Sequence, residues 1–95
     1  MRILQLDDWC AIEFSGEDRI GFLQGQLTQD LHRLAAAASP LAGWCNARGR
    51  LEALGQLLPA PDRIYWLLPA DIAAPTVEAI GRFRLRARVN IEPSP

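Results

Sequence analysis

The first strong pattern along the chain is a set of leucines at helical spacing, which predicts an amphipathic helix. Its buried face is expected to carry Leu23, Leu27, Leu31 and Leu34. Gly25 and the β-branched Thr28 both weaken a helix, so a break is expected there. A second short helical piece is predicted at 29–34.

Runs of β-branched, aromatic and apolar residues predict four strands, at 9–14, 41–45, 51–58 and 64–68. The turn at 46–49 contains Gly49, which can adopt a positive φ, so the second and third strands are expected to form a hairpin. Ser15 and Asp18 lie between the first strand and the first helix and have the spacing of a capping box.

The C-terminal third predicts a second helix and a last strand. Asp71 and Pro75 favour a helix start, and this helix is expected to continue to about Leu85. Between Phe83 and Ile91 apolar residues alternate with polar ones, which indicates a strand. The residues 93–95, with two prolines, are not expected to continue it.

The resulting element order, β-α-β-β-(β)-α-β, is typical of an α+β, ferredoxin-like fold with an antiparallel sheet and helices on one face. The core is expected to include Leu23, Leu27, Trp44, Leu67 and Ile80.

Composition narrows the class of protein. The chain has 95 residues, 49% of them hydrophobic, so a single domain over 1–95 with a modest core is expected. A formal net charge of −1 argues against a general nucleic-acid or membrane-surface binder. Cys10 and Cys45 are far apart, which disfavours a metal site or disulfide framework and suits the cytoplasm. No signal peptide or bilayer-spanning run is recognised.

Polar residues around the predicted helix break are a first set of candidates for ligand binding. They are uncharged donors and acceptors beside one carboxylate: Gln24, Gln26, Thr28, Gln29 and Asp30. Such a set can present hydrogen-bonding groups to a ligand or a neighbouring domain. Alternatively, it can satisfy backbone groups nearby, as side chains of these types often do.

Arginines form the second set of candidates. Arg48 and Arg50 flank the predicted hairpin tip beside Asn46, and a basic row follows at Arg82, Arg84, Arg86 and Arg88. Guanidinium groups bind carboxylates and phosphates in bidentate geometry, so an anionic ligand with a carboxylate tail is predicted. A solvated charged edge is the alternative for both groups. No residue is predicted to be catalytic, since the single histidine, His32, has no nucleophile at a recognisable spacing.

Four stretches, in order, carry a resemblance to a known family. They are Ser-Gly-Glu-Asp-Arg at 15–19, Phe-Leu-Gln-Gly-Gln-Leu-Thr-Gln-Asp at 22–30, Asn-Ala-Arg-Gly-Arg-Leu at 46–51 and Phe-Arg-Leu-Arg-Ala-Arg-Val at 83–89. With these motifs the chain resembles the N-terminal part of the YgfZ family, which is related to the glycine-cleavage T protein, an aminomethyltransferase.

The resemblance implies tetrahydrofolate as the bound cofactor, in a cleft between domains. It also implies a role in iron–sulfur cluster assembly or repair and in tRNA modification. The ligand-facing wall is then expected to comprise Gln26, Thr28, Asp30, Asn46, Arg48 and Arg50. The implied partners are folate, a missing C-terminal domain or partner subunit, and indirectly iron–sulfur proteins. Neither a membrane nor direct nucleic-acid binding is expected.

Two departures from the related families limit what the resemblance implies. T proteins follow the comparable hairpin with Gly-Gly and an Asp pair, where this chain has Gly49-Arg50 and Ala53-Leu54. The one carboxylate there, Glu52, is out of register, so methylene transfer is not expected. The YgfZ hallmark Lys-Gly-Cys-Tyr-x-Gly-Gln-Glu is absent, so an N-terminal fragment or truncated product is expected.

Two alternative functions stay open at this point. One is a folate-dependent one-carbon transferase subunit of a glycine-cleavage or sarcosine-oxidase-like complex. The other is a module that binds protein or RNA through the arginines of 82–88.

Overall fold

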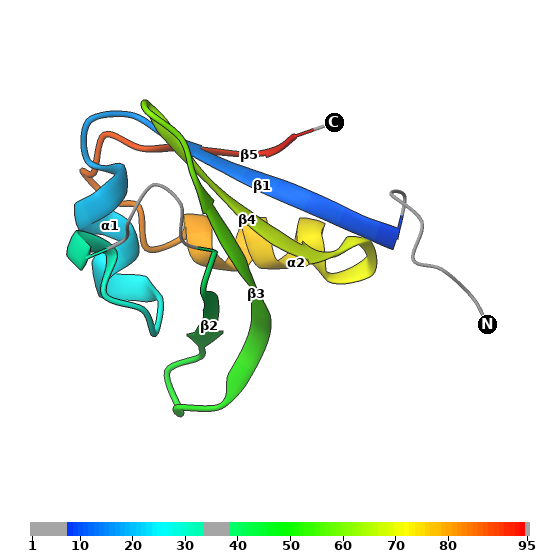
Figure 1. The fold of residues 1–95 in the computed structure, drawn as a ribbon. Coiled ribbons are helices and arrows are strands. Elements are labelled where there is room, and N and C mark those ends of the chain that lie inside the picture. Colours follow the sequence, from blue (N-terminus) through cyan, green and yellow to red (C-terminus); the bar gives the residue numbers. More distant parts are fainter. Residues whose placement is uncertain (1–7, 34–38, 95) are drawn as a thin grey trace.

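The computed structural model describes residues 8–33 and 39–94, which form a single five-stranded antiparallel sheet with two α-helices (Figure 1). The strands are β1 (Trp9–Ser15), β2 (Leu41–Cys45), β3 (Leu51–Pro59), β4 (Arg63–Pro69) and β5 (Asn90–Ser94). The helices are α1 (Arg19–Gln26), the short 3-10 helix η2 (Leu31–Arg33) and α2 (Ala70–Gly81). The predicted α+β class is therefore confirmed.

The strand order is β2-β3-β4-β1-β5, with every neighbouring pair antiparallel. β4 and β5 are consequently parallel to each other, with β1 between them and α2 as their connection. This half is a split β-α-β unit, which is one part of the predicted ferredoxin-like pattern. The other half differs, because three consecutive strands follow α1 and leave β2 antiparallel to β1 across the sheet.

One face of the sheet, the inner face, packs against α2. Alternating residues of the three central strands are buried there: Ile12, Phe14, Ala53, Gly55, Leu57, Ile64, Trp66 and Leu68. The buried residues of α2 are Ala73, Thr76 and Ile80. Trp66 is the largest fully buried side chain, and its Nε1 donates to the carbonyl oxygen of Ala42 at 3.2 Å. Apolar burial on this face is the main stabilising contribution.

Most of the predicted core is confirmed. Leu23, Leu27, Trp44 and Ile80 are buried and belong to one cluster. Leu67 was expected there and is only half-buried. The reason is the alternation of β4, in which Trp66 and Leu68 point to the inner face and Leu67 points to the opposite, outer face.

The predicted helix break is confirmed, since α1 ends at Gln26 and η2 begins at Leu31. The predicted capping box is wrong: Asp18 is the N-cap, without a side-chain cap bond. Its Oδ2 instead accepts from the backbone N–H of Arg88 at 2.7 Å, and its own N–H donates to the Arg88 carbonyl at 3.1 Å. Gly16, at φ 109°, allows this contact, because a Cβ there would lie 2.3 Å from the same carbonyl oxygen.

The boundaries predicted for the C-terminal third are wrong. α2 ends at Gly81, and turns follow, with N–H donation from Arg84 to Gly81 and from Ala87 to Arg84. Leu85 takes a positive φ of 46°, which a strand does not allow. The backbone of this segment bonds to its own turns and to Asp18, so the alternating pattern forms no ladder before β5. β5 in turn continues through Pro93 and Ser94.

α2 begins at Ala70, which places Asp71 in its first turn and Pro75 in its interior rather than at its start. Neither α1 nor α2, within the residues described, has the length and hydrophobicity of a membrane-spanning helix. Leu34 of the predicted helical face lies outside the described residues.

Candidate functional site

The turn between β2 and β3 is shaped by Asn46. Its Oδ1 accepts from the backbone N–H groups of Arg48 at 2.9 Å and Arg50 at 3.1 Å, and its Nδ2 donates to Glu52 Oε1 at 2.7 Å. Gly49 takes a φ of 78°, as the sequence predicts for this turn. The guanidinium groups of Arg48 and Arg50 are exposed and make no ion pair or hydrogen bond with any described residue. The tip of the hairpin therefore presents two arginines available to an anion.

The polar residues after α1 bind the edge of β2. Gln26 Oε1 accepts from the indole N–H of Trp44 at 3.1 Å. Thr28 exchanges two hydrogen bonds with the backbone of Gly43: its Oγ1 accepts from the Gly43 N–H at 2.9 Å, and its N–H donates to the Gly43 carbonyl at 3.0 Å. Gln29 Nε2 donates to the Leu41 carbonyl at 2.7 Å. This segment closes the open edge of β2, an edge that otherwise invites pairing with another chain.

Two further polar residues of this stretch support local structure. Gln24 Oε1 accepts from the N–H of Leu31 at 2.6 Å. Asp30 Oδ1 accepts from the N–H of His32 at 3.1 Å, and its Oδ2 lies 3.5 Å from Nε of Arg33. The alternative in which these side chains satisfy nearby backbone groups therefore describes most of what they do in the fold.

The six predicted ligand residues thus divide into two groups. Gln26, Thr28, Asp30 and Asn46 make structural hydrogen bonds, whereas the side chains of Arg48 and Arg50 make none within the described chain. The structure connects the groups through β2, since Gln26 bonds Trp44 two residues before Asn46.

A crevice of about 290 Å³ lies between the hairpin and α2, and sequence reasoning missed it. It is lined by Trp44, Glu52, Ile72, Pro75, Thr76 and Ala79. Thr76 is only 6% exposed, and its hydroxyl has no hydrogen bond to any described residue. A signal was present in the sequence: a single threonine on the apolar face of the second helix. The Asn46–Glu52 hydrogen bond connects this crevice to the hairpin tip.

Most of the predicted basic row is engaged within the fold. Arg82 pairs with Glu78 at 3.5 Å, Arg84 donates to the Val89 carbonyl at 3.5 Å, and Arg88 pairs with Glu17. Arg86 alone of the row makes no such contact with the described residues. Fewer arginines of this row are therefore available to bind an anionic partner than the sequence indicates.

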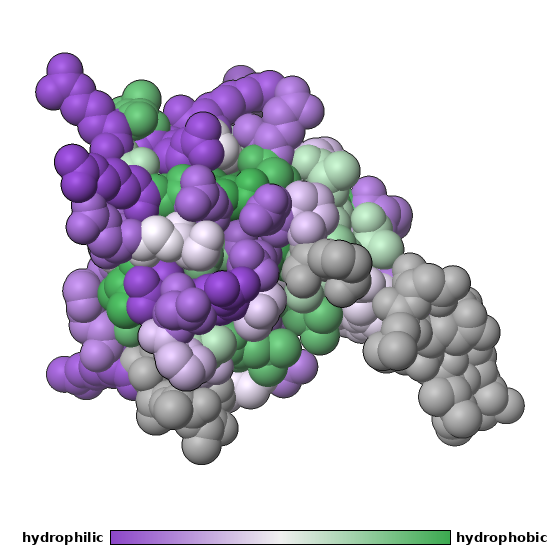
Figure 2. Space-filling model, turned by 90° about the horizontal axis from the view of Figure 1, so that it is seen from above, coloured by the Kyte–Doolittle hydropathy of each residue, from purple (hydrophilic) through white to green (hydrophobic). Residues whose placement is uncertain are grey.

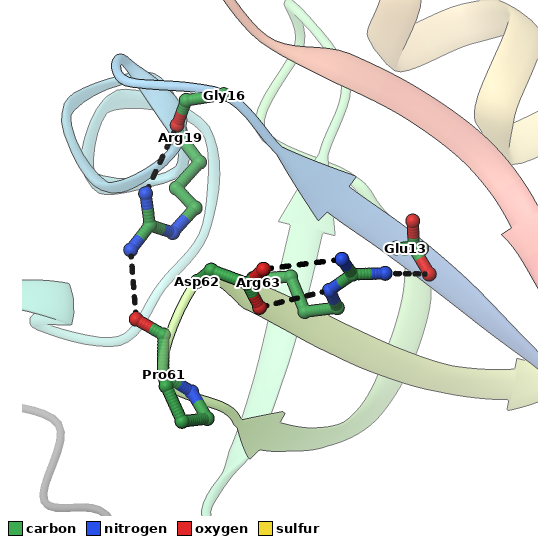
Figure 3. A network of polar contacts seen from close by, with 6 residues as sticks. All are labelled: Glu13, Gly16, Arg19, Pro61, Asp62 and Arg63. Carbon is green, nitrogen blue, oxygen red and sulfur yellow. Dashed lines mark hydrogen bonds and ion pairs between the residues drawn. The ribbon is translucent and has the colours of Figure 1, made fainter.

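A polar network ties the start of α1 to the β3–β4 turn (Figure 3). Arg19 donates to the carbonyl oxygens of Gly16 at 3.0 Å and Pro61 at 3.4 Å. Arg63 lies between two carboxylates, 3.0 Å from Asp62 and 3.0 Å from Glu13. Hydrogen bonding and the positive charge of Arg63 lower the pKa of the Asp62 carboxyl below its ordinary value. These contacts stabilise the fold at the end of the sheet opposite the hairpin tip.

Comparison with known proteins identifies relatives of the whole described fold. No family model matches the chain. A tRNA-modifying protein YgfZ of Edwardsiella ictaluri is 36% identical over 91 residues, which cover 96% of this chain and 28% of that protein. The chain is homologous to part of the YgfZ tRNA-modifying proteins. The resemblance seen in the sequence motifs is thereby confirmed.

Two further comparisons also match nearly the whole of this chain to a minor part of a longer protein. A YgfZ tRNA-modifying protein of Yersinia pestis is 26% identical over 95 residues, all of this chain and 29% of that protein. The crystal structure of glycine cleavage system aminomethyltransferase T from Bartonella henselae matches with a TM-score of 0.85 and 17% identity. That match covers 94% of this chain and 25% of the transferase, and it shows the fold alone. The chain thus spans less than a third of the curated relatives that it matches.

The two positions at which T proteins are expected to carry aspartates lie on opposite faces of β3. Ala53 is buried on the inner face, and Leu54 is exposed on the outer face. Neither side chain can hold or move a proton. The neighbouring carboxylate of β3, Glu52, lines the crevice and accepts a hydrogen bond from Asn46 Nδ2.

Proposed function

We propose that this chain is a non-catalytic folate-binding domain, cytoplasmic, and part of a YgfZ-type protein that acts in iron–sulfur cluster assembly or repair and in tRNA modification. It corresponds to the N-terminal domain of such a protein, over 1–95. The observation that carries the proposal is at the hairpin tip beside the crevice, where the guanidinium groups of Arg48 and Arg50 make no ion pair or hydrogen bond with the described residues. The homology to YgfZ proteins supports the choice of folate as the ligand.

In this proposal Arg48 and Arg50 bind the carboxylate tail of tetrahydrofolate by charge-assisted hydrogen bonds. The aromatic body of the ligand enters the crevice against Trp44, which is held by its bond to Gln26. Asn46 positions the two arginines, because it fixes both of their backbone N–H groups. Thr28 positions the wall from the other side, through its hydrogen bonds to Gly43 of β2, and Asp30 stabilises the neighbouring helix η2.

Titration with folinic acid, followed by NMR amide shifts and the Trp44 indole signal, tests this proposal. Shifts are expected at 26–30 and 46–50. The double variant Arg48→Ala with Arg50→Ala is expected to weaken binding about tenfold or more, since a hydrogen bond to a charged group contributes about 1.5–3 kcal/mol. Arg86→Ala is the matched control, an exposed arginine away from the tip that also makes no ion pair or hydrogen bond with the described residues.

Two outcomes would contradict the proposal: no shift at millimolar ligand, or equal weakening by Arg86→Ala. The transferase alternative gains no support from β3, where Ala53 and Leu54 replace the expected carboxylates. The alternative of RNA binding through the basic row loses support, because three of its four arginines are engaged within the fold.

A further inference from the structure

The outer face of the sheet carries four exposed leucines on β2 and β3. Their exposed fractions are 55% for Leu41, 52% for Leu51, 48% for Leu54 and 39% for Leu58, and together they are called the leucine patch below. Half-exposed leucines occur singly on most proteins, but a contiguous group on one sheet face indicates an interaction surface.

Two leucine side chains of the patch come close to each other above Gly43. A Cβ on this residue would lie 2.6 Å from Cδ1 of Leu51 and 3.7 Å from Cδ1 of Leu54, so both side chains cross the strand over the bare glycine. Leu41 pairs with Gln56 in the next row, and Leu58 pairs with Tyr65 of β4. The outward positions 41, 43, 54, 56 and 58 contain no charged residue.

The other half of the same face is polar. Glu13 of β1 pairs with Arg63 of β4 at 3.0 Å, and Glu92 of β5 lies opposite Glu13 in the register. Hydrophilic residues also cover much of the side on which β5 lies (Figure 2). An antiparallel sheet that meets water normally alternates apolar and polar faces, as this half does. The half formed by β2 and β3 does not follow that rule.

We propose that the leucine patch is the docking surface for a second folded protein layer with an apolar, uncharged contact surface. This layer is of the kind that the longer relatives carry in the part of their sequence that this chain does not match. Two observations identify this occupant. The patch has no charge with which to select a charged ligand. The relatives carry about 70% of their length outside the matched region, and that additional protein needs a surface on which to pack.

Co-production of this chain with the unmatched part of the Edwardsiella ictaluri relative tests the proposal. The tagged chain is expected to recover that part in a one-to-one complex, measured by size-exclusion chromatography with light scattering. Leu54→Asp with Leu58→Asp is expected to reduce recovery about tenfold or more, because it buries two uncompensated carboxylates in the contact. Leu85→Asp is the matched control, since Leu85 is 89% exposed and lies outside the patch.

Circular dichroism checks that each variant folds and that the unmatched part of the relative is folded when produced alone. The milder pair Leu54→Gln with Leu58→Gln is expected to give an intermediate loss. Three results would overturn the proposal: no recovery by the wild-type chain, equal recovery with the aspartate pair, or a homodimer of the chain alone that the aspartate pair dissociates. The last would show that a second copy covers the patch. None of these readouts involves folate, so this proposal can fail while folate binding holds.

Discussion

The inner and outer faces of the sheet are built by the same alternation of residues, yet they have different surroundings. On the inner face Phe14, Leu57 and Trp66 are fully buried against the helices. On the outer face Leu54 and Leu58, which lie on the same strand as Leu57, remain exposed. The difference lies in what covers each face and not in the strands themselves.

This comparison separates two roles for apolar residues in one small domain. Those of the inner face stabilise the fold, because folding removes them from water. Those of the outer face keep 39–55% of their area exposed after folding, so they contribute less to the stability of the isolated chain. Their exposure is explained if they contribute to binding a second protein layer, as proposed above.

The largest difference between the two faces is expected in the free energy of unfolding when one side chain on each face is truncated to alanine. Trp66→Ala should cost about 3–5 kcal/mol, because it leaves a cavity and removes the donor to the Ala42 carbonyl. Leu58→Ala should cost less than about 1 kcal/mol, as exposed positions usually do. Urea unfolding followed by circular dichroism measures both free energies. Equal losses would contradict the comparison, since they would mean that Leu58 is buried in solution.

A smaller difference in stability is expected from alanine substitution of two glycines, Gly43 and Gly55, at which an added Cβ would point to opposite faces of the β2–β3 pair. A Cβ on Gly55 would lie 2.0 Å from the carbonyl oxygen of Leu67, which is backbone and cannot easily move. Gly55→Ala should therefore cost about 1–3 kcal/mol. On Gly43 the nearest atom is the flexible side chain of Leu51, so Gly43→Ala should cost less. Thermal unfolding of both variants checks this order, and the reverse order would show that the outer face is the more tightly packed one.

Short-range patterns predicted the elements well where local chemistry decides the structure. The hairpin turn follows from Gly49 and Asn46, and the helix break follows from Gly25 and Thr28. The alternation at 83–91 was misleading because the decisive contact is distant in sequence. Asp18 binds the backbone of Arg88, 70 residues away, and no local pattern reports such a bond.

For the candidate site as well, the parts that depend on local sequence could be predicted and those that depend on distant contacts could not. Arg48 and Arg50 are adjacent to a recognisable turn, so a free basic tip could be anticipated. Gln26 and Thr28 hold the edge of β2, which depends on how α1 meets the sheet. The crevice around Thr76 lies between elements far apart in the chain, so its shape follows only from their packing.

The smallest effect is expected from the ion pairs at the polar end of the sheet, between Arg63, Asp62 and Glu13. The folded state lowers the pKa of Asp62, through the hydrogen bond and positive charge of Arg63, so the unfolded chain binds more protons in acid. The resulting stabilisation is present above the unfolded pKa and is lost as the pH falls below about 4. It should be slight, since Asp62 is exposed and screened by salt. Melting temperatures from pH 6 to 3 should therefore fall slightly more for the wild type than for Asp62→Asn, and added salt should reduce the difference. A larger fall of the melting temperature in the variant would contradict a stabilising Arg63–Asp62 pair. It would leave the Arg63–Glu13 pair as the ion pair that stabilises the polar half of the outer face.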